Sequence, residues 1–306
     1  MIVEVHSHPF GPPSQKNIGD KIKSVSDLIG FRGRYPELYN TRLTEPLVDY
    51  ADEFLSEMDK YGIEKALIMS TGSADSEETR NQKIAAVIEK HPDRLGGLMT
   101  LGTDYTNEGF GDNPEALRQN ASDRIDHYIG KLGFKGIGET HGGPFTTEVH
   151  PVHIAEQLRP IMESLTRHNA PLLLATGWTQ FPGRMYYNDP IYVDEIAGRF
   201  PDVPIVLTKM GRGIDHYFES ALIVALRNPN VYLDTTSTTA QHIRRAVKTI
   251  GAQRIMFGTD WSPTWKWVRD PEPLYTTRFK VVKESGISEL EAEWVLGKTA
   301  VELYKL

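Results

Sequence analysis

Cysteine is absent from this chain of 306 residues, and its absence excludes several kinds of chemistry. Disulfides, thiol nucleophiles, iron–sulfur clusters and cysteine-type zinc fingers all require it. Long apolar runs are also lacking: Ala221–Leu226 is far shorter than the ~20 residues that a membrane-spanning helix needs. No basic segment followed by an apolar one begins the sequence, so we expect no secretory signal and a cytoplasmic protein.

Positive charge is in short supply. The 34 Lys and Arg residues face 41 Asp and Glu residues, which gives a net charge of -7. A protein that binds bulk nucleic acid or anionic membrane needs a basic face. We therefore expect a small-molecule substrate, with no nucleic-acid and no membrane partner. The sequence does not determine the oligomeric state, and a homo-oligomer is one of the states that it allows.

Short apolar runs alternate with helical patterns along the whole chain. Runs that are apolar throughout, rather than alternating, are typical of parallel strands covered on both faces. Eight strand–helix units predict one (β/α)8 TIM barrel over residues 1–306, with an open doubly wound sheet as the alternative. The predicted strands are Ile2–His6, Lys65–Ser70, Leu95–Leu101, Phe134–Glu139, Pro171–Thr176, Pro204–Lys209, Val231–Asp234 and Arg254–Asp260.

Helical patterns follow most of these strands. Pro114 at the first position of one pattern is typical of a helix start. The predicted helices are Leu47–Tyr61, Thr79–Lys90, one that begins at Asn113–Glu115, His153–His168, Ile191–Phe200, Asp215–Leu226, Ala240–Ile250 and Glu289–Tyr304. Three segments are too long to be plain connections: Pro9–Thr44, Trp178–Pro190 and Trp261–Leu274 follow strands 1, 5 and 8. A barrel builds its active site at these strand ends, so the segments predict extended active-site loops over a small organic substrate.

The pair His6 and His8 ends the first predicted strand. Residues two apart in a strand point to the same side, so both imidazoles can approach one metal ion. Asp260 ends the last strand, which is next to the first in a closed barrel. Its carboxylate is predicted either to bind the metal, to move a proton of a metal-bound water, or merely to cap the turn at Ser262 and Pro263.

Glu139 and His141 form the third group, at the end of strand 4. The Gly136–Gly138 phrase before them does not continue as a dinucleotide-binding loop, because His141 stands where the third glycine belongs. Glu139 is open to a functional role or to a structural salt bridge, and His141 to a site role or an ordinary loop position. Phosphate-binding loops, a Gly-x-Ser-x-Gly elbow and His-Glu-x-x-His do not occur.

These residues together resemble the amidohydrolase superfamily, in particular its amidohydrolase-2 branch of metal-dependent TIM-barrel hydrolases and decarboxylases. The resemblance runs over nearly the whole chain. It is carried by His6–His8 and by the phrases Phe134–Ile137, Phe200–Leu207, Asn230–Thr235, Arg254–Asp260 and Gly297–Tyr304, although Thr299 stands where Asn is usual. The phrase Ile137–Glu139 is also similar to the TatD-like nucleases, in which the Glu binds metal.

Two positions depart from the family. Ala175 stands where the family usually has a His after strand 5, and Lys209 where it has one after strand 6. The resemblance then implies one divalent ion, zinc with manganese as the alternative, on His6, His8 and Asp260, with Glu139 as a fourth ligand. Such a set leaves room for water or substrate.

The resemblance implies a metal-dependent hydrolase of a small, carboxylate-bearing amide, ester or lactone, with Asp260 as the proton-transferring residue. One alternative is a non-oxidative decarboxylase of an aromatic or unsaturated acid. The other is a degenerate barrel that binds a ligand without catalysis.

Substrate contacts are predicted for Lys209, Arg212, His141, Trp178 and Trp261. Lys209 and Arg212 would hold an anionic group, because a guanidinium offers a planar fork of donors and an ammonium a compact charge. The alternative for Lys209 is a structural bridge to Glu139 or Asp260.

Overall fold

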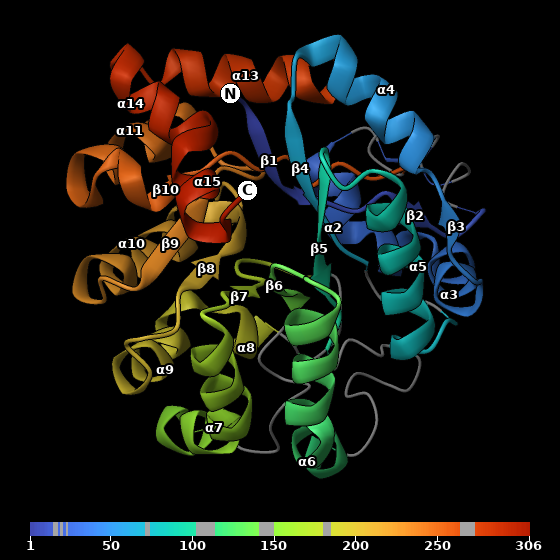
Figure 1. Cartoon of the computed structure of the whole chain (residues 1–306). Helices are drawn as coiled ribbons and strands as arrows, with labels where there is room; N and C mark the ends of the chain where they lie inside the picture. Colours follow the sequence, from blue (N-terminus) through green and yellow to red (C-terminus); the bar gives the residue numbers. More distant parts are fainter. Residues whose placement is uncertain are drawn as a thin grey trace.

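The computed structural model describes residues 1–14, 18, 21–22, 24–70, 74–101, 114–140, 150–179, 185–263 and 273–306. In this part of the chain eight parallel strands form one sheet in the order β1-β4-β5-β6-β7-β8-β9-β10 (Figure 1). The TIM barrel and its eight strands are confirmed. Their bounds are β1 (Val3–Ser7), β4 (Lys65–Ile68), β5 (Leu95–Met99), β6 (Gly136–Thr140), β7 (Leu172–Leu174), β8 (Ile205–Leu207), β9 (Val231–Asp234) and β10 (Ile255–Met256).

The last strand and the first are joined by backbone contacts, which close the barrel. Val5 N donates to Phe257 O at 3.0 Å, Asp260 N to His6 O at 2.9 Å, and His8 N to Trp261 O at 2.7 Å. A further parallel bridge joins Ser7 and Trp261. The segment after β10 therefore runs directly beside the segment that carries the two histidines.

Alternate residues of the strands face opposite sides, as the period of a β-strand requires. One buried cluster takes a residue from six of the eight strands and lies inside the barrel: Val5, Leu67, Leu98, Leu173, Val206 and Met256. Their neighbours along the strands, such as Ala66, Leu172 and Ile205, pack instead against the surrounding helices. Because both faces are covered, the strands read as continuous apolar runs.

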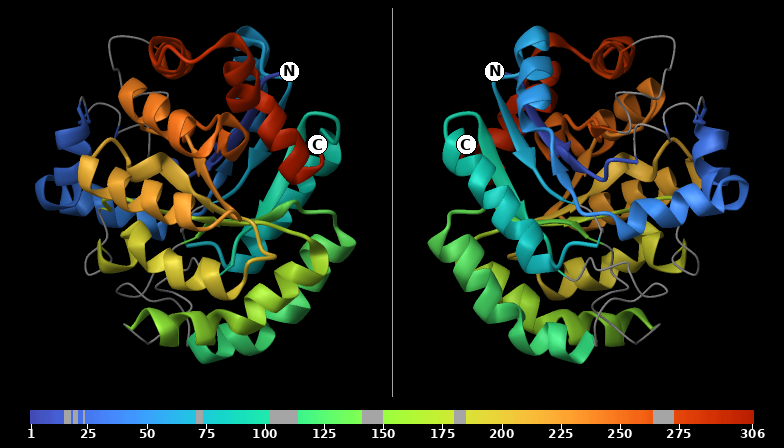
Figure 2. Two further views of the ribbon diagram at one scale, coloured as in Figure 1. Left: turned by 90° about the vertical axis from the view of Figure 1, so that its left-hand side faces the viewer. Right: turned by 90° about the vertical axis from the view of Figure 1, so that its right-hand side faces the viewer.

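Helices surround the strands (Figures 1 and 2). They are α4 (Ala51–Tyr61), α5 (Glu77–Lys90), α6 (Pro114–Ile125), α7 (Pro151–His168), α9 (Val193–Arg199), α10 (Asp215–Arg227), α11 (Ala240–Ile250), α13 (Leu274–Glu284), α14 (Glu289–Glu293) and α15 (Thr299–Tyr304). Helix α13 was not predicted, and the helix predicted over Glu289–Tyr304 is divided by a π-helical turn at Trp294–Lys298. None of the helices within the described ranges is long and apolar enough to cross a membrane.

The segment after β1 forms a small substructure of its own. It contains the antiparallel pair β2 (Phe10–Gly11) and β3 (Val48–Asp49), and the helices α2 (Val25–Arg34) and α3 (Pro36–Thr44). Figure 2 shows α2 and α3, in blue, on the opposite side of the barrel from α15, in red. Four apolar side chains of this substructure pack on Trp178, which follows β7: Ile18, Ile22, Phe31 and Tyr39. The long segment after strand 1 therefore covers part of the loop after strand 5.

Candidate metal centre

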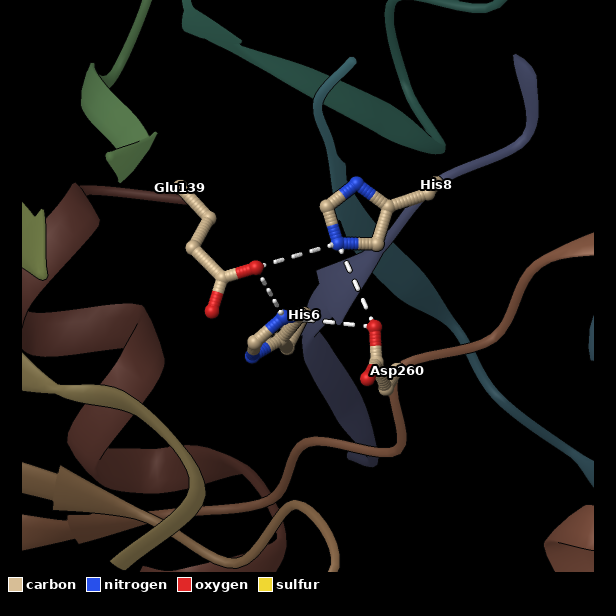
Figure 3. Close-up of side chains that lie close together, drawn as sticks. All are labelled: His6, His8, Glu139 and Asp260. Atoms are coloured by element: carbon tan, nitrogen blue, oxygen red, sulfur yellow. Dashed lines mark ion pairs between the residues drawn. The ribbon is translucent and has the colours of Figure 1, made fainter. Parts of the chain in front are cut away.

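Four side chains converge at the end of the barrel where the strands terminate. His6 lies on β1 and Glu139 on β6, while His8 follows β1 and Asp260 follows β10. Each offers one ligand atom, and these four atoms all lie within 4.8 Å of one another. Figure 3 shows the two imidazoles and the two carboxylates pointing toward a common space. All four residues are buried.

The separations between the donor atoms suit a divalent ion. His6 Nε2 lies 3.4 Å from Glu139 Oε2 and 3.6 Å from Asp260 Oδ1. His8 Nε2 lies 3.6 Å and 3.3 Å from the same two oxygens. Metal–ligand bonds of about 2.1 Å in tetrahedral geometry place neighbouring ligands about 3.4 Å apart. The donors thus stand at the spacing that a shared metal ion requires.

His8 gives an independent indication of a ligand. Both of its ring nitrogens are buried, yet neither has a hydrogen-bond partner among the described residues. A buried polar group without a partner costs free energy unless something else satisfies it. A metal ion bound at Nε2 would satisfy that nitrogen, so the donor set fits the metal that its chemistry suggests.

The side chain of Glu4 joins the two segments that carry the histidines and Asp260. The carboxylate Oε1 of Glu4 accepts hydrogen bonds from His6 N at 3.0 Å and from Thr259 N at 2.9 Å. Complete burial raises the pKa of Glu4 to about 8, although these backbone donors oppose the shift. Asp260 itself has a left-handed backbone, with φ of 63°. The role of Glu4 was missed from the sequence, where it looks like any residue of the first strand.

Asp234, at the end of β9, orients His6. Its Oδ2 lies 2.8 Å from His6 Nδ1, and both side chains are fully buried. Its other oxygen accepts from the backbone N–H groups of Lys209 at 2.7 Å and Thr236 at 2.9 Å. A carboxylate that binds the outer nitrogen of a ligating histidine fixes the ring orientation and tautomer. The role of Asp234 was also missed from the sequence. Asp234 ends an apolar strand, and the same feature identified Asp260.

Lys209 reaches into the cluster from the segment after β8. Its Nζ donates to Glu139 Oε1 at 2.6 Å and lies 3.1 Å from His6 Nε2 and 3.5 Å from Asp260 Oδ2. The sequence left open whether Lys209 binds substrate or forms a structural bridge. The observed contacts are those of a bridge to Glu139 and Asp260. Ala175, the other departure from the family, is a buried residue directly after β7.

Charges within the cluster set the protonation states. Burial alone would raise the pKa of Glu139 and of Asp260, but the ammonium of Lys209 prevails and lowers both below their ordinary values. For His6, burial and Lys209 oppose protonation, yet Glu139 and Asp234 prevail and raise its pKa to about 10, so a metal ion bound at Nε2 would displace a proton from that nitrogen. Both carboxylates are therefore ionised at neutral pH, as metal ligands must be.

Two of the predicted substrate contacts lie together beside this cluster. The guanidinium carbon of Arg212 stands 3.8 Å from the centre of the Trp178 ring, and Nη1 donates to Trp178 O at 2.8 Å. Burial lowers the pKa of Arg212, while the charges of Asp260 and Glu139 oppose that shift. The guanidinium is thus fixed in orientation within electrostatic reach of both carboxylates.

Two further residues were predicted to contact the substrate, Trp261 and His141. The Trp261 ring is almost fully buried and packs on Phe54 of α4 at 4.8 Å, so this packing does not support a substrate contact. Its backbone carbonyl instead accepts the hydrogen bond from His8 N. His141 lies outside the described residues.

Comparison with known proteins agrees with this geometry. A family model described as amidohydrolase matches residues 3–306. A search of curated proteins finds no match. Among solved structures, 2,6-dihydroxybenzoate decarboxylase from Rhizobium is 18% identical with a TM-score of 0.64, over 99% of this chain and 98% of that one.

Two further solved structures are similar over their length. One is 5-carboxyvanillate decarboxylase from Novosphingobium aromaticivorans, with bound manganese and 3-methoxy-4-hydroxy-5-nitrobenzoic acid. It is 16% identical, with a TM-score of 0.66, over 100% of this chain and 97% of that one. The other is 4-oxalomesaconate hydratase from Rhodopseudomonas palustris. It is 14% identical, with a TM-score of 0.64, over 100% of this chain and 96% of that one. At these identities the similarity shows the fold.

Proposed function

The chain belongs to the amidohydrolase family, and on that premise we propose that it is a metal-dependent, non-oxidative decarboxylase of an aromatic or unsaturated acid. The observation that carries the proposal is the full-length similarity to decarboxylases of hydroxylated benzoic acids. This favours the alternative over the hydrolase that the sequence first suggested. The four-donor cluster supports it, since one of these decarboxylases was crystallised with manganese and a nitrobenzoic acid.

We assign the metal to His6, His8, Glu139 and Asp260, with manganese or zinc as the ion. When bound, a divalent ion supplies Lewis-acid chemistry that neutralises and orients the oxygens of an acidic substrate. The protein's part is to keep the two carboxylates ionised, which Lys209 does, and to hold the His6 ring by Nδ1 so that Nε2 faces the ion, which Asp234 does.

Arg212 and Trp178 are proposed to position the substrate. The guanidinium can donate two parallel hydrogen bonds to an anionic group, because its planar fork matches the two oxygens of a carboxylate. The indole on which it stacks limits the directions that the guanidinium can take. A flat acid bound in this way would lie between Arg212 and the four-donor cluster.

Asp260 is the residue to which we assign the proton transfer. In a non-oxidative decarboxylation the carbon–carbon bond breaks, CO2 leaves, and the electron pair that stays on carbon takes up a proton. Asp260, ionised in the resting site, would take that proton from solvent and pass it to the carbon, and Lys209 Nζ, at 3.5 Å from Oδ2, favours its return to the ionised form. General acid–base catalysis of this kind contributes about 10²–10⁴-fold in rate.

The test is a panel assay in D2O with Mn²⁺ or Zn²⁺. Dihydroxybenzoates and carboxyvanillates form one arm; esters, lactones and amides form the other. We expect CO2 release and one deuterium at the vacated carbon of the product, both lost in Asp260→Asn and retained in the control His153→Ala on α7. Hydrolysis of an ester, lactone or amide without CO2 release would replace this proposal with the hydrolase. A protein with neither metal nor activity would favour the degenerate barrel.

A further inference from the structure

Glu139 and Asp260 each divide their two oxygens between different neighbours. The oxygens Glu139 Oε2 and Asp260 Oδ1 face the Nε2 atoms of the two histidines, at 3.3–3.6 Å. The other two, Glu139 Oε1 and Asp260 Oδ2, face Lys209 Nζ at 2.6 Å and 3.5 Å. Each carboxylate therefore has one oxygen toward the histidine nitrogens and one toward Lys209, whose Nζ also lies 3.1 Å from His6 Nε2.

Lys209 is held firmly in this place. Its side chain is 4% exposed, and its backbone has the left-handed conformation, with φ of 69°. The N–H of Lys209 donates to Asp234 Oδ1, so the residue that orients His6 also anchors the lysine. Thr208, its neighbour, donates through Oγ1 to Glu139 Oε1 at 2.8 Å, so Glu139 keeps one oxygen turned toward this side.

We propose that Lys209 is a built-in cation that shares Glu139 and Asp260 with a single divalent ion, limits the centre to that one ion, and weakens its binding. The inference rests on the metal site of the proposed function. An ammonium beside the shared carboxylates repels a divalent ion. It also occupies the position from which a second ion would bind Glu139 Oε1 and Asp260 Oδ2.

The charge balance of the loaded centre follows from this arrangement. Glu139, Asp260 and Asp234 carry three negative charges, which one divalent ion and the Lys209 ammonium balance. Arg212 then remains as the cation beside a neutral centre, so the site as a whole selects an anionic ligand. A second divalent ion in place of the lysine would change that balance.

Metal binding without substrate tests the proposal. Apoprotein would be titrated with Mn²⁺ by calorimetry for wild type, Lys209→Met, Lys209→Arg and the control Lys248→Met, an exposed lysine on α11. Thermal unfolding with and without Mn²⁺ would be recorded for each, and electron paramagnetic resonance at millimolar Mn²⁺ would count the ions. Lys209→Gln, purified in Mn²⁺, replaces the Met variant if that chain does not fold.

Wild type should bind one ion, and Lys209→Met should bind it roughly 10-fold or more tightly, because a like charge has been removed. The Met variant should unfold at a lower temperature without metal and gain more from Mn²⁺ than wild type does. Lys209→Arg and Lys248→Met should bind as wild type.

Unchanged or weaker binding in Lys209→Met, or coupled Mn²⁺ pairs in wild type, would overturn the role of Lys209 alone. A wild-type protein that binds no divalent ion would overturn the metal site and the proposed function together.

Discussion

The Oδ2 atom of Asp234 accepts a hydrogen bond from Nδ1 of His6 at 2.8 Å, inside a barrel that buries both residues completely. This contact places a proton on Nδ1 and turns Nε2 toward Glu139, Asp260 and Lys209, so Nε2 is the nitrogen that would give up its proton to bind a metal ion. Because Oδ1 of Asp234 already accepts from two backbone N–H groups, the carboxylate has a defined orientation. Asp234 therefore decides which nitrogen of His6 can bind metal.

Asp234→Asn should weaken metal binding by about 10–100-fold, measured by calorimetry with Mn²⁺. The amide must turn its oxygen to the backbone N–H groups, so its NH2 faces Nδ1 and moves the imidazole proton to Nε2. Asp215→Asn is the matched control, because Asp215 binds the buried His242 at 2.9 Å outside the four-donor cluster. Equal metal affinity in wild type and Asp234→Asn would show that Asp234 does not set the tautomer.

His8→Ala should reduce the metal content of the purified protein well below one ion per chain. It removes one of four ligands, and the ring that it removes makes no hydrogen bond to the described residues, so the fold should tolerate the change. Elemental analysis after dialysis measures the effect, with His153→Ala, an exposed histidine on α7, as the control. Undiminished metal in His8→Ala would exclude this residue as a ligand.

Arg212→Lys should raise KM for the acid substrate about 10-fold or more while kcat changes less. A lysine keeps the charge but loses the planar fork and the stacking on Trp178. One charge-assisted hydrogen bond contributes about 1.5–3 kcal/mol. Steady-state kinetics measure the effect, with Arg245→Lys on the outer face of α11 as the control. A fall in kcat with KM unchanged would count against a role in substrate binding.

The barrel was predictable because its strands are continuous apolar runs, and their ends coincide with His6–His8, Glu139 and Asp260. Once the strand order follows the sequence, these ends must meet at one end of the barrel. The covering segment was not predictable in the same way. Helix α2 contains Gly30 and Gly33, which disfavour helix formation, and its Phe31 is buried in a cluster that includes Trp178, far away in the chain.

Within the site, the converging ligands were predictable and their surroundings were not. Asp234 and Glu4 look in the sequence like ordinary strand residues, and their roles depend on which backbone N–H groups the closed barrel brings to them. The contacts of Lys209 depend on a positive φ that no local sequence pattern indicated. Sequence alone therefore left its two roles open.

Gly211→Ala should destabilise the protein by about 3 kcal/mol or more, because a Cβ there meets backbone that cannot move. Gly211 has φ of 79°, and an added Cβ would lie 2.3 Å from the backbone nitrogen of Phe218. Gly62→Ala is the matched control: its φ is 69° and nothing lies within 4 Å of the added atom. It should cost only about 1–2 kcal/mol, the strain of a left-handed alanine. Chemical denaturation measures both, and equal losses would show that the close approach at Phe218 contributes nothing.

Asp126→Asn should lower stability near neutral pH, and the loss should disappear in acid. Oδ1 of Asp126 accepts hydrogen bonds from His168 at 2.6 Å and Arg167 at 3.3 Å, which tie the π-helical turn after α6 to the end of α7. The bond from His168, with help from Arg167, lowers the pKa of Asp126 below its ordinary value. A carboxyl whose pKa is lower in the folded than in the unfolded chain stabilises the fold above the unfolded pKa. That contribution is lost as the pH falls through the folded pKa.

Denaturant unfolding of wild type and Asp126→Asn from about pH 6 to about pH 3 should show the difference in their free energies of unfolding shrinking toward zero. Asp202→Asn, in the exposed turn between α9 and β8, should show a smaller difference from wild type. A gap for Asp126→Asn that stays constant or widens as the pH falls would mean that the ionised carboxylate does not stabilise this junction.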